Sequence, residues 1–384
     1  MGLRRAYIGL AAVLMILPAL ALTAPATAET VPAEWTVMFY MDGDNNVESY
    51  ALRDLVELEA SGSDASVSIV VLLDTLEGPA DLLYVGNGAS TVVEAWGEVN
   101  MGDPATLTSF IDASEALYPA ENYALVMWDH GGGLVGLCWD DTSDGDRLTL
   151  AEFRSGVVNA GLAFDVTVFN ACVMATAEVA HQMAGYSDYV IFSQENMYAL
   201  GFPYTDVADA LKASPTMDGR SMALMMAQEY TDYYFSIGYS GVTISVYDMA
   251  QLDGVASAVN AFGGAQSSTM STYYRAYKAC RKATPAPNNQ ADLVTYARNV
   301  IASADIADSG VKAAAQDVVT AVQAAIIYEW HTDDVTGENG LGIWFPTKSV
   351  TYYWGASYEA MYRALPFDAA SNWADFLDSY YNKG

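Results

Sequence analysis

The sequence has 384 residues, 47 of them acidic and 16 Lys or Arg, with a formal net charge of −31. This excess of acid excludes nucleic acid as a partner, because phosphate contacts need lysine and arginine. A hydrophobic content of 52% suffices for a packed core and excludes a disordered chain, and the length allows two or three domains or one large α/β domain with an appendage.

Residues 1–28 have the pattern of a secretory signal peptide. Arg4 and Arg5 form the basic start, an apolar run covers residues 6–22, and Ala-Thr-Ala at 26–28 has the small-x-small form of a cleavage site. We therefore expect a secreted or extracellular protein, with the cell envelope as the other location, and no stable membrane insertion after signal removal. The alternative interpretation is an uncleaved membrane anchor.

The chain contains three cysteines: Cys138, Cys172 and Cys280. A secreted protein that relied on disulfides would usually carry more, in even number. An odd count leaves at least one thiol without an intramolecular partner, and a free thiol in an exported protein is a candidate for chemistry.

Strands and helices alternate over residues 34–250. The predicted strands are 35–41, 67–73, a hairpin of 82–85 and 91–96, then 123–128, 164–169 and 189–192, and the predicted helices are 47–60, 105–117, 150–159 and 175–183. Such alternation indicates an α/β fold, a mainly parallel sheet with helices on both faces. Residues 251–384 are mostly helical, so we expect a helical C-terminal region that returns a strand near 341–345 to the core.

Ligands bind beyond the carboxyl ends of the strands in such sheets. Polar and reactive residues gather at those positions, namely Asp42, Asp44 and Asn45, then Asp74, Asp129 and His130, Asn170 and Cys172, and Gln194 and Glu195. We therefore expect the functional site at this edge.

His130 and Cys172 are the candidate catalytic pair. Cys172 follows an apolar strand and precedes a predicted helix, whose start would lower the thiol pKa. His130 follows a neighbouring strand and opens a run of three glycines, whose backbone can approach a substrate closely. The pattern fits attack of a thiolate on an acyl carbon, with the histidine handling the proton.

The chain resembles the clostripain-like cysteine peptidases of the caspase–gingipain–legumain clan. The resemblance rests on five segments spread over most of the chain: 35–45, 128–131 (WDHG), 146–152 (DRLTLAE), 169–176 (FNACVMAT) and 340–346 (GLGIWFP). It implies a caspase-like fold, a Cys172–His130 dyad that hydrolyses peptide bonds through a thioester, and an oxyanion site at the backbone N–H groups of Gly131 and Cys172. It implies polypeptide substrates and no required cofactor.

The chain departs from the family two residues before Cys172. Family members usually have Asp there, where it helps to bind the Arg or Lys before the scissile bond, but this chain has Asn170. A neutral amide cannot give a guanidinium the charge-assisted bond of a carboxylate. Asn45, Asn170 and Glu195 are the candidate substrate-binding residues, and Glu195 is the alternative source of a carboxylate.

Two acidic loops are candidates for Ca²⁺, although a solvated acidic turn explains each as well. Residues 42–48 are rich in oxygen ligands, and Asp140, Asp144 and Asp146 partly match an EF-hand loop, with Ala151 where its last ligand would be.

Two further functional alternatives stay open at this point: a non-catalytic envelope or binding protein on the same fold, and a transpeptidase that uses the same acyl-enzyme. The resemblance also suggests activation by self-cleavage, for which Arg147 is the candidate site because it follows a polar loop.

Overall fold

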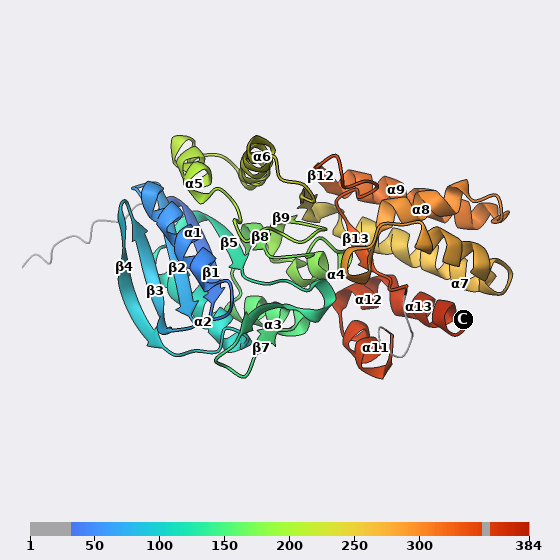
Figure 1. Ribbon diagram of the computed structural model, residues 1–384, viewed down its shortest axis with the longest axis horizontal. Helices are drawn as coiled ribbons and strands as arrows, with labels where there is room; N and C mark the ends of the chain where they lie inside the picture. Colours follow the sequence, from blue (N-terminus) through green and yellow to red (C-terminus); the bar gives the residue numbers. More distant parts are fainter. Residues whose placement is uncertain (1–31, 348–353, 384) are drawn as a thin grey trace, which may run out of the picture. The chain divides into compact units, whose positions relative to one another are not determined.

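The computed structural model describes residues 32–347 and 354–383, so the predicted signal peptide lies outside the described residues. Its centre is a nine-stranded sheet in the order β12-β10-β9-β8-β5-β1-β2-β3-β4 (Figure 1). The five parallel strands are β1 (Ala33–Gly43), β2 (Val67–Thr75), β5 (Ala120–Trp128), β8 (Phe164–Asn170) and β9 (Ser187–Phe192). The predicted mainly parallel sheet is confirmed.

Antiparallel strands complete both sides of the sheet. The predicted hairpin is present as β3 (Gly78–Gly86) and β4 (Ala89–Gly97) beside β2. On the other side, β10 (Thr243–Asp248) pairs with β9, and β12 (Ile326–His331) pairs with β10. Neither β10 nor β12 was predicted from the sequence.

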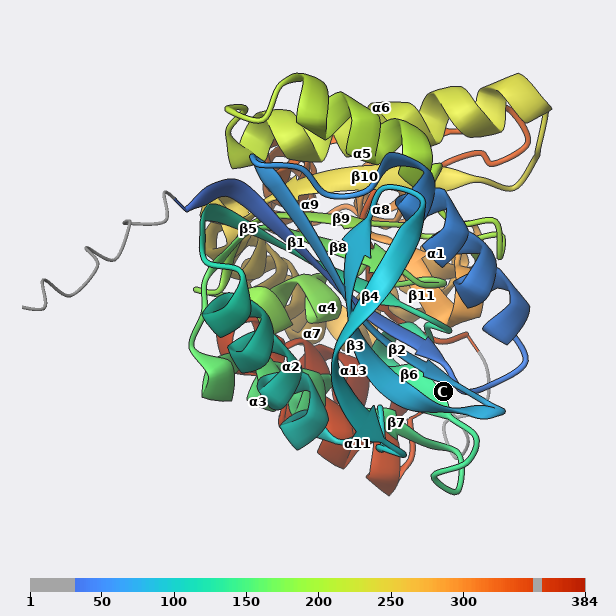
Figure 2. The same ribbon diagram turned by 90° about the vertical axis from the view of Figure 1, so that its left-hand side faces the viewer.

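The parallel strands are apolar on both faces, because both faces are covered by helices. Along β1, Val37 and Phe39 pack with α1 (Glu48–Ser61), α5 (Tyr204–Ala213) and α6 (Gly219–Ile237). Met38 and Tyr40 face the opposite side, where α2 (Pro104–Leu117), α3 (Leu150–Ala160) and α7 (Leu252–Lys282) cover the sheet. In Figure 2, α5 and α6 lie above the sheet and α2 and α3 below it. The prediction of helices on both faces is confirmed.

The C-terminal region is mostly helical, as predicted. Its helices are α7, α8 (Leu293–Ala302), α9 (Ser309–Ala325), α11 (Ala356–Arg363), α12 (Pro366–Ser371) and α13 (Trp373–Tyr381). No helix within residues 32–347 and 354–383 is long and apolar enough to cross a membrane.

The strand near 341–345 does not join the main sheet. It is β13 (Gly342–Trp344), which pairs with β11 (Gln290–Asp292) in a separate two-stranded sheet. The N–H of Gly342 donates to the carbonyl of Ala175 (2.8 Å), which holds β13 beside the chain that follows Cys172. The C-terminal region thus places a strand at 342–344, and its residues are buried in the core, but the strand that joins the main sheet is β12.

Glu178, in the short helix α4 (Ala177–Ala180), connects the catalytic half of the chain to the C-terminal region. Its Oε1 accepts hydrogen bonds from the Trp344 N–H (2.9 Å) and the Tyr362 hydroxyl (2.6 Å). The side chain is fully buried, and burial raises the pKa of Glu178.

We predict that Glu178→Ala lowers the free energy of unfolding by about 3 kcal/mol, because two buried donors lose their acceptor. Glu178→Gln keeps an acceptor oxygen and is the matched control, with an expected loss of less than about 1 kcal/mol. Urea denaturation measures both, and equal losses would show that the hydrogen bonds of Glu178 are not what stabilises this junction.

Candidate active site

His130 and Cys172 are brought together by the register of β5 and β8. These strands pair in parallel with Trp128 opposite Asn170, and each candidate residue lies two positions beyond its strand. Both side chains line one cavity of about 130 Å³ at the carboxyl ends of the strands, together with Val47, Trp128, Asp129, Asn170, Ala171 and residues 197–199.

Gly131 allows the two strand ends to touch. A Cβ on this residue would lie 2.3 Å from the carbonyl oxygen of Cys172 and 2.8 Å from its nitrogen, distances that only glycine avoids. On the far side of Cys172, Val173 has a φ of 54°, which is strained for a β-branched residue. Its N–H donates to the carbonyl of Glu195 (3.1 Å), so the segment that carries Cys172 is fixed on both sides.

The resting thiol is not activated by a helix start. The helix α4 begins at Ala177, five residues after Cys172, and its N-cap is Thr176. Burial raises the pKa of the Cys172 thiol, and its Sγ donates to the carbonyl of Met197 at 3.6 Å. The predicted lowering of this pKa was therefore wrong, because the helix starts too far along the chain and desolvation disfavours the thiolate.

The imidazole of His130 is oriented by Asn46. Its Nε2 lies 2.8 Å from Asn46 Oδ1, and a proton on Nε2 would leave Nδ1 as the proton acceptor. Burial lowers the pKa of His130, which favours neutral imidazole. Among the described residues no hydrogen bond joins His130 to Cys172, and burial favours the neutral thiol and the neutral imidazole. The role of Asn46 was missed, because sequence gives no sign of which side chain in the turn after β1 reaches the histidine.

Asn45 forms hydrogen bonds with the segments next to His130. Its Nδ2 donates to Asp129 Oδ1 and to the carbonyl of Trp139, both at 2.8 Å, and the residue is buried. Asn45 is not among the residues that line the cavity. The structure therefore places it in contact with the strand end that precedes His130.

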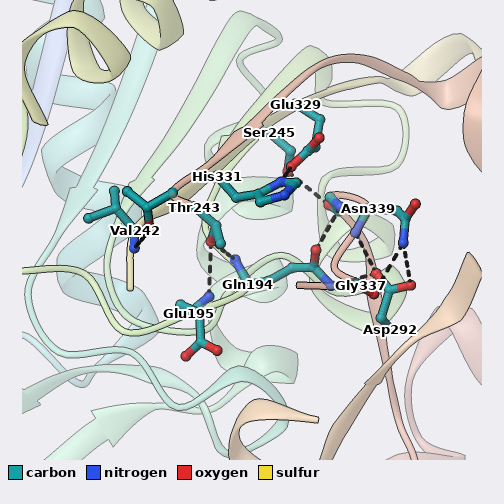
Figure 3. Close-up of polar contacts among 12 residues, drawn as sticks. Gln194, Glu195, Val242, Thr243, Ser245, Asp292, Glu329, His331, Gly337 and Asn339 are labelled. Atoms are coloured by element: carbon teal, nitrogen blue, oxygen red, sulfur yellow. Dashed lines mark hydrogen bonds and ion pairs between the residues drawn. The ribbon is translucent and has the colours of Figure 1, made fainter. Parts of the chain in front are cut away.

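Asn170 lines the cavity, whereas Glu195 does not. Glu195 lies three residues after β9, and its backbone N–H donates to Thr243 Oγ1 (3.1 Å), as Figure 3 shows. Burial, followed by the charge of the Glu195 carboxylate, raises the pKa of Glu338 to about 9. The neighbouring Gln194 bonds Asp292 and the Gly340 N–H, so this end of β9 is tied to the loop before β13.

Arg147 lies in a short hairpin of β6 (Leu137–Asp140) and β7 (Asp146–Leu148), which the sequence analysis did not predict. Its backbone pairs with Trp139, its Nε donates to the carbonyl of Val135 (2.8 Å), and its guanidinium lies over the Trp139 ring. Cleavage after Arg147 would require β7 to separate from β6.

Four carboxylates from separate segments converge beside the site. Oxygens of Asp44, Asp74, Glu98 and Asp140 lie within 4.8 Å of one another, and all but Glu98 are buried. One oxygen of Asp44 and one of Asp74 have no hydrogen-bond partner among the described residues. Burial, followed by the Glu98 charge, raises the pKa of Asp74 to about 8.

This cluster fits a hard cation with oxygen ligands, such as Ca²⁺. Each predicted acidic loop contributes one member, Asp44 and Asp140, but Asp144 and Asp146 lie outside the cluster. Asp74 and Glu98 were not assigned to either loop.

A cysteine and a histidine that share a cavity at the carboxyl edge of a mainly parallel α/β sheet have the residue types that nucleophilic catalysis needs. The model of the clostripain family, Peptidase C11, matches residues 39–380. The chain therefore belongs to the clostripain family of cysteine peptidases.

Relatives of known structure have the same fold. A secreted C11 cysteine protease from Bacteroides thetaiotaomicron, in complex with an irreversible peptide inhibitor, is 21% identical, with a TM-score of 0.70 over 89% of this chain and 99% of that one. An inactive zymogen C11 protease from Parabacteroides distasonis is 22% identical, with a TM-score of 0.68 over the same shares. Clostripain from Hathewaya histolytica is 25% identical over an aligned length of 289 residues, and the match covers 59% of this chain and 55% of clostripain. The chain thus matches about half the length of that relative.

We predict that alkylation of Cys172 by iodoacetamide accelerates with rising pH to a midpoint above the ordinary thiol value of 9.0, because burial disfavours the thiolate. The modified residue is identified by peptide mapping. A rate that is already maximal at neutral pH would contradict this and indicate a preformed thiolate–imidazolium pair.

Proposed function

We propose that this chain is a secreted endopeptidase in which Cys172 is the nucleophile and His130 the general base. The observation that carries the proposal is that both side chains line one cavity at the ends of adjacent parallel strands. Secretion is supported by the pattern of residues 1–28 and by the secreted structural relative.

The geometry supports the following sequence of steps. As the sulfur attacks the peptide carbonyl carbon, His130 takes the thiol proton, and the developing oxyanion faces the backbone N–H groups of Gly131 and Cys172. The imidazolium then protonates the departing amine, which leaves a thioester on Cys172. Water attacks the thioester with His130 again as base, so the acid is released and the thiol is restored.

Asn46 acts as a positioning residue in this scheme. Its hydrogen bond to Nε2 fixes the ring and leaves Nδ1 as the nitrogen that can accept a proton. The side chain of Asn46 is exposed in the free protein, so a substrate that covers it would strengthen the contact.

We further propose that the cluster of Asp44, Asp74, Glu98 and Asp140 binds Ca²⁺. Buried carboxylates this close must share protons or a cation, and the unpartnered oxygens of Asp44 and Asp74 are available as ligands. Asp44 follows β1 only two residues before Asn46, so an ion there would fix the turn that orients His130.

We predict that Cys172→Ala and His130→Ala each abolish peptide hydrolysis without loss of folding. The matched control is the double variant Cys138→Ser, Cys280→Ser, which changes two buried thiols away from the cavity and keeps its activity. Turnover of a quenched fluorescent peptide measures all three. Near-normal turnover by either single variant would contradict the assignment, and an inert wild-type protein would favour the non-catalytic alternative.

We predict that Ca²⁺ at about 100 times its Kd raises the free energy of unfolding by about 2.7 kcal/mol, and that a chelator reverses the effect. Asp74→Asn should stabilise the calcium-free protein, because one buried like charge is removed, and should abolish the response to Ca²⁺. Asp144→Asn, outside the cluster, is the control. An unchanged unfolding curve with Ca²⁺ would show that these carboxylates share protons instead.

A further inference from the structure

Asn170, which lines the cavity beside Cys172 and forms what we call its floor, carries a buried amide oxygen, Oδ1, without a hydrogen-bond partner among the described residues. A buried acceptor without a donor is costly, so it is expected where a ligand supplies the donor. The side chain of the substrate residue before the scissile bond would enter here, next to the sulfur.

A buried carboxyl lies directly behind this floor. Asp54 belongs to α1 and occupies the apolar stripe of that helix between Ala51 and Leu58, where a hydrophobic residue would be expected. Its Oδ2 accepts a hydrogen bond from the indole Nε1 of Trp128 (2.8 Å), a residue that lines the cavity. Its Oδ1 is buried and has no partner in the described part of the chain.

Gly201 shows that the amide and the carboxyl converge. This glycine has a φ of 60°, and a Cβ on it would lie 2.9 Å from Asn170 Oδ1 and 2.9 Å from Asp54 Oδ2. The two oxygens therefore both lie next to Gly201, at a place where a side chain on this residue would not fit.

Within the described residues, Asp54 forms no ion pair. Arg53 is adjacent, but its guanidinium pairs with Glu57 (2.5 Å). Tyr204 from α5 and Tyr234 from α6 also face Asp54. Burial is the main cause that raises the pKa of Asp54 to about 8, and the Glu57 charge raises it further. The hydrogen bond from Trp128 and the charge of Arg53 lower this pKa but do not offset the effect of burial.

We propose that Asp54 is the specificity-determining carboxyl of this peptidase and, with Asn170, selects a substrate with Arg or Lys before the scissile bond. The inference rests on the proposed peptidase function. The acid that the family places at position 170 has moved to the helix behind it, and Asn170 is neutral because a second carboxylate beside Asp54 would be repelled. Asn170 Oδ1 contacts the cation, and Asp54 attracts it across a short, poorly screened distance.

The test compares two peptides that differ only in the residue before the scissile bond, arginine or its neutral isostere citrulline. The readout is the ratio of their kcat/KM values. In the wild-type protein this ratio should rise as the pH passes through about 8, because Asp54 of the free enzyme ionises there. The ionisations of Cys172 and His130 affect both peptides equally, so they cancel in the ratio. Asp54→Asn keeps an acceptor for Trp128, and we expect it to lower the ratio at least about tenfold and to remove its pH dependence.

Two further variants complete the design. Glu59→Gln removes a carboxylate from the same helix that does not act on Asp54, keeps an acceptor for the Ser90 N–H, and should leave the ratio near the wild-type value. The double variant Asp54→Asn, Asn170→Asp returns the acid to the strand end and should restore the preference for arginine. Thermal unfolding confirms folding, and the pH profile of the wild-type ratio tests the proposal even where a variant does not fold.

A wild-type ratio near one or flat with pH, or an equal loss of both activities in Asp54→Asn, would overturn the role of Asp54. These outcomes leave the peptidase function intact, since the protein would still hydrolyse peptides. An absence of hydrolysis for every peptide would instead contradict the proposed function itself.

Discussion

The strands β5 and β8 pair in parallel with Trp128 opposite Asn170, and this register determines where the reactive groups lie. Both strands are buried on two faces, so neither can slip by one residue without exposing its apolar side chains. Two residues beyond the pair, the chain presents His130 from one strand and Cys172 from the other. Gly131 lets the two backbones approach, and the strained Val173 is held by the end of β9.

Burial controls the charge of nearly every group around the site. Desolvation raises the pKa values of Cys172, Asp54 and Asp74 and lowers that of His130, so the thiol and the imidazole rest uncharged. In the proposed function His130 becomes charged when it takes the thiol proton, a substrate cation would favour the ionised form of Asp54, and a metal cation would favour that of Asp74. In a protein with a net charge of −31, such cations are drawn to the surface as well as to the site.

Sequence predicted the parts of the molecule that have strong periodicity. Apolar runs marked the parallel strands, and the residues after them marked His130 and Cys172. Short or irregular elements were missed: the hairpin β6–β7 has strands of four and three residues, and β12 follows α9 without a turn residue. Asp54 was overlooked although it carried a signal, a carboxylate on the apolar stripe of α1. Asn46 carried none, because only the folded turn shows that it reaches His130.

The most direct measurement is the capture of the acyl-enzyme. The protein would be mixed with a peptide ester, quenched in acid within milliseconds, digested and analysed by mass spectrometry. We expect an acyl group of the substrate's mass on the peptide that contains Cys172, and we expect it to disappear when quenching is delayed until the substrate is consumed. An acyl group on Cys138 or Cys280, or turnover that leaves no cysteine acylated at any time, would contradict the assignment of Cys172 as the nucleophile.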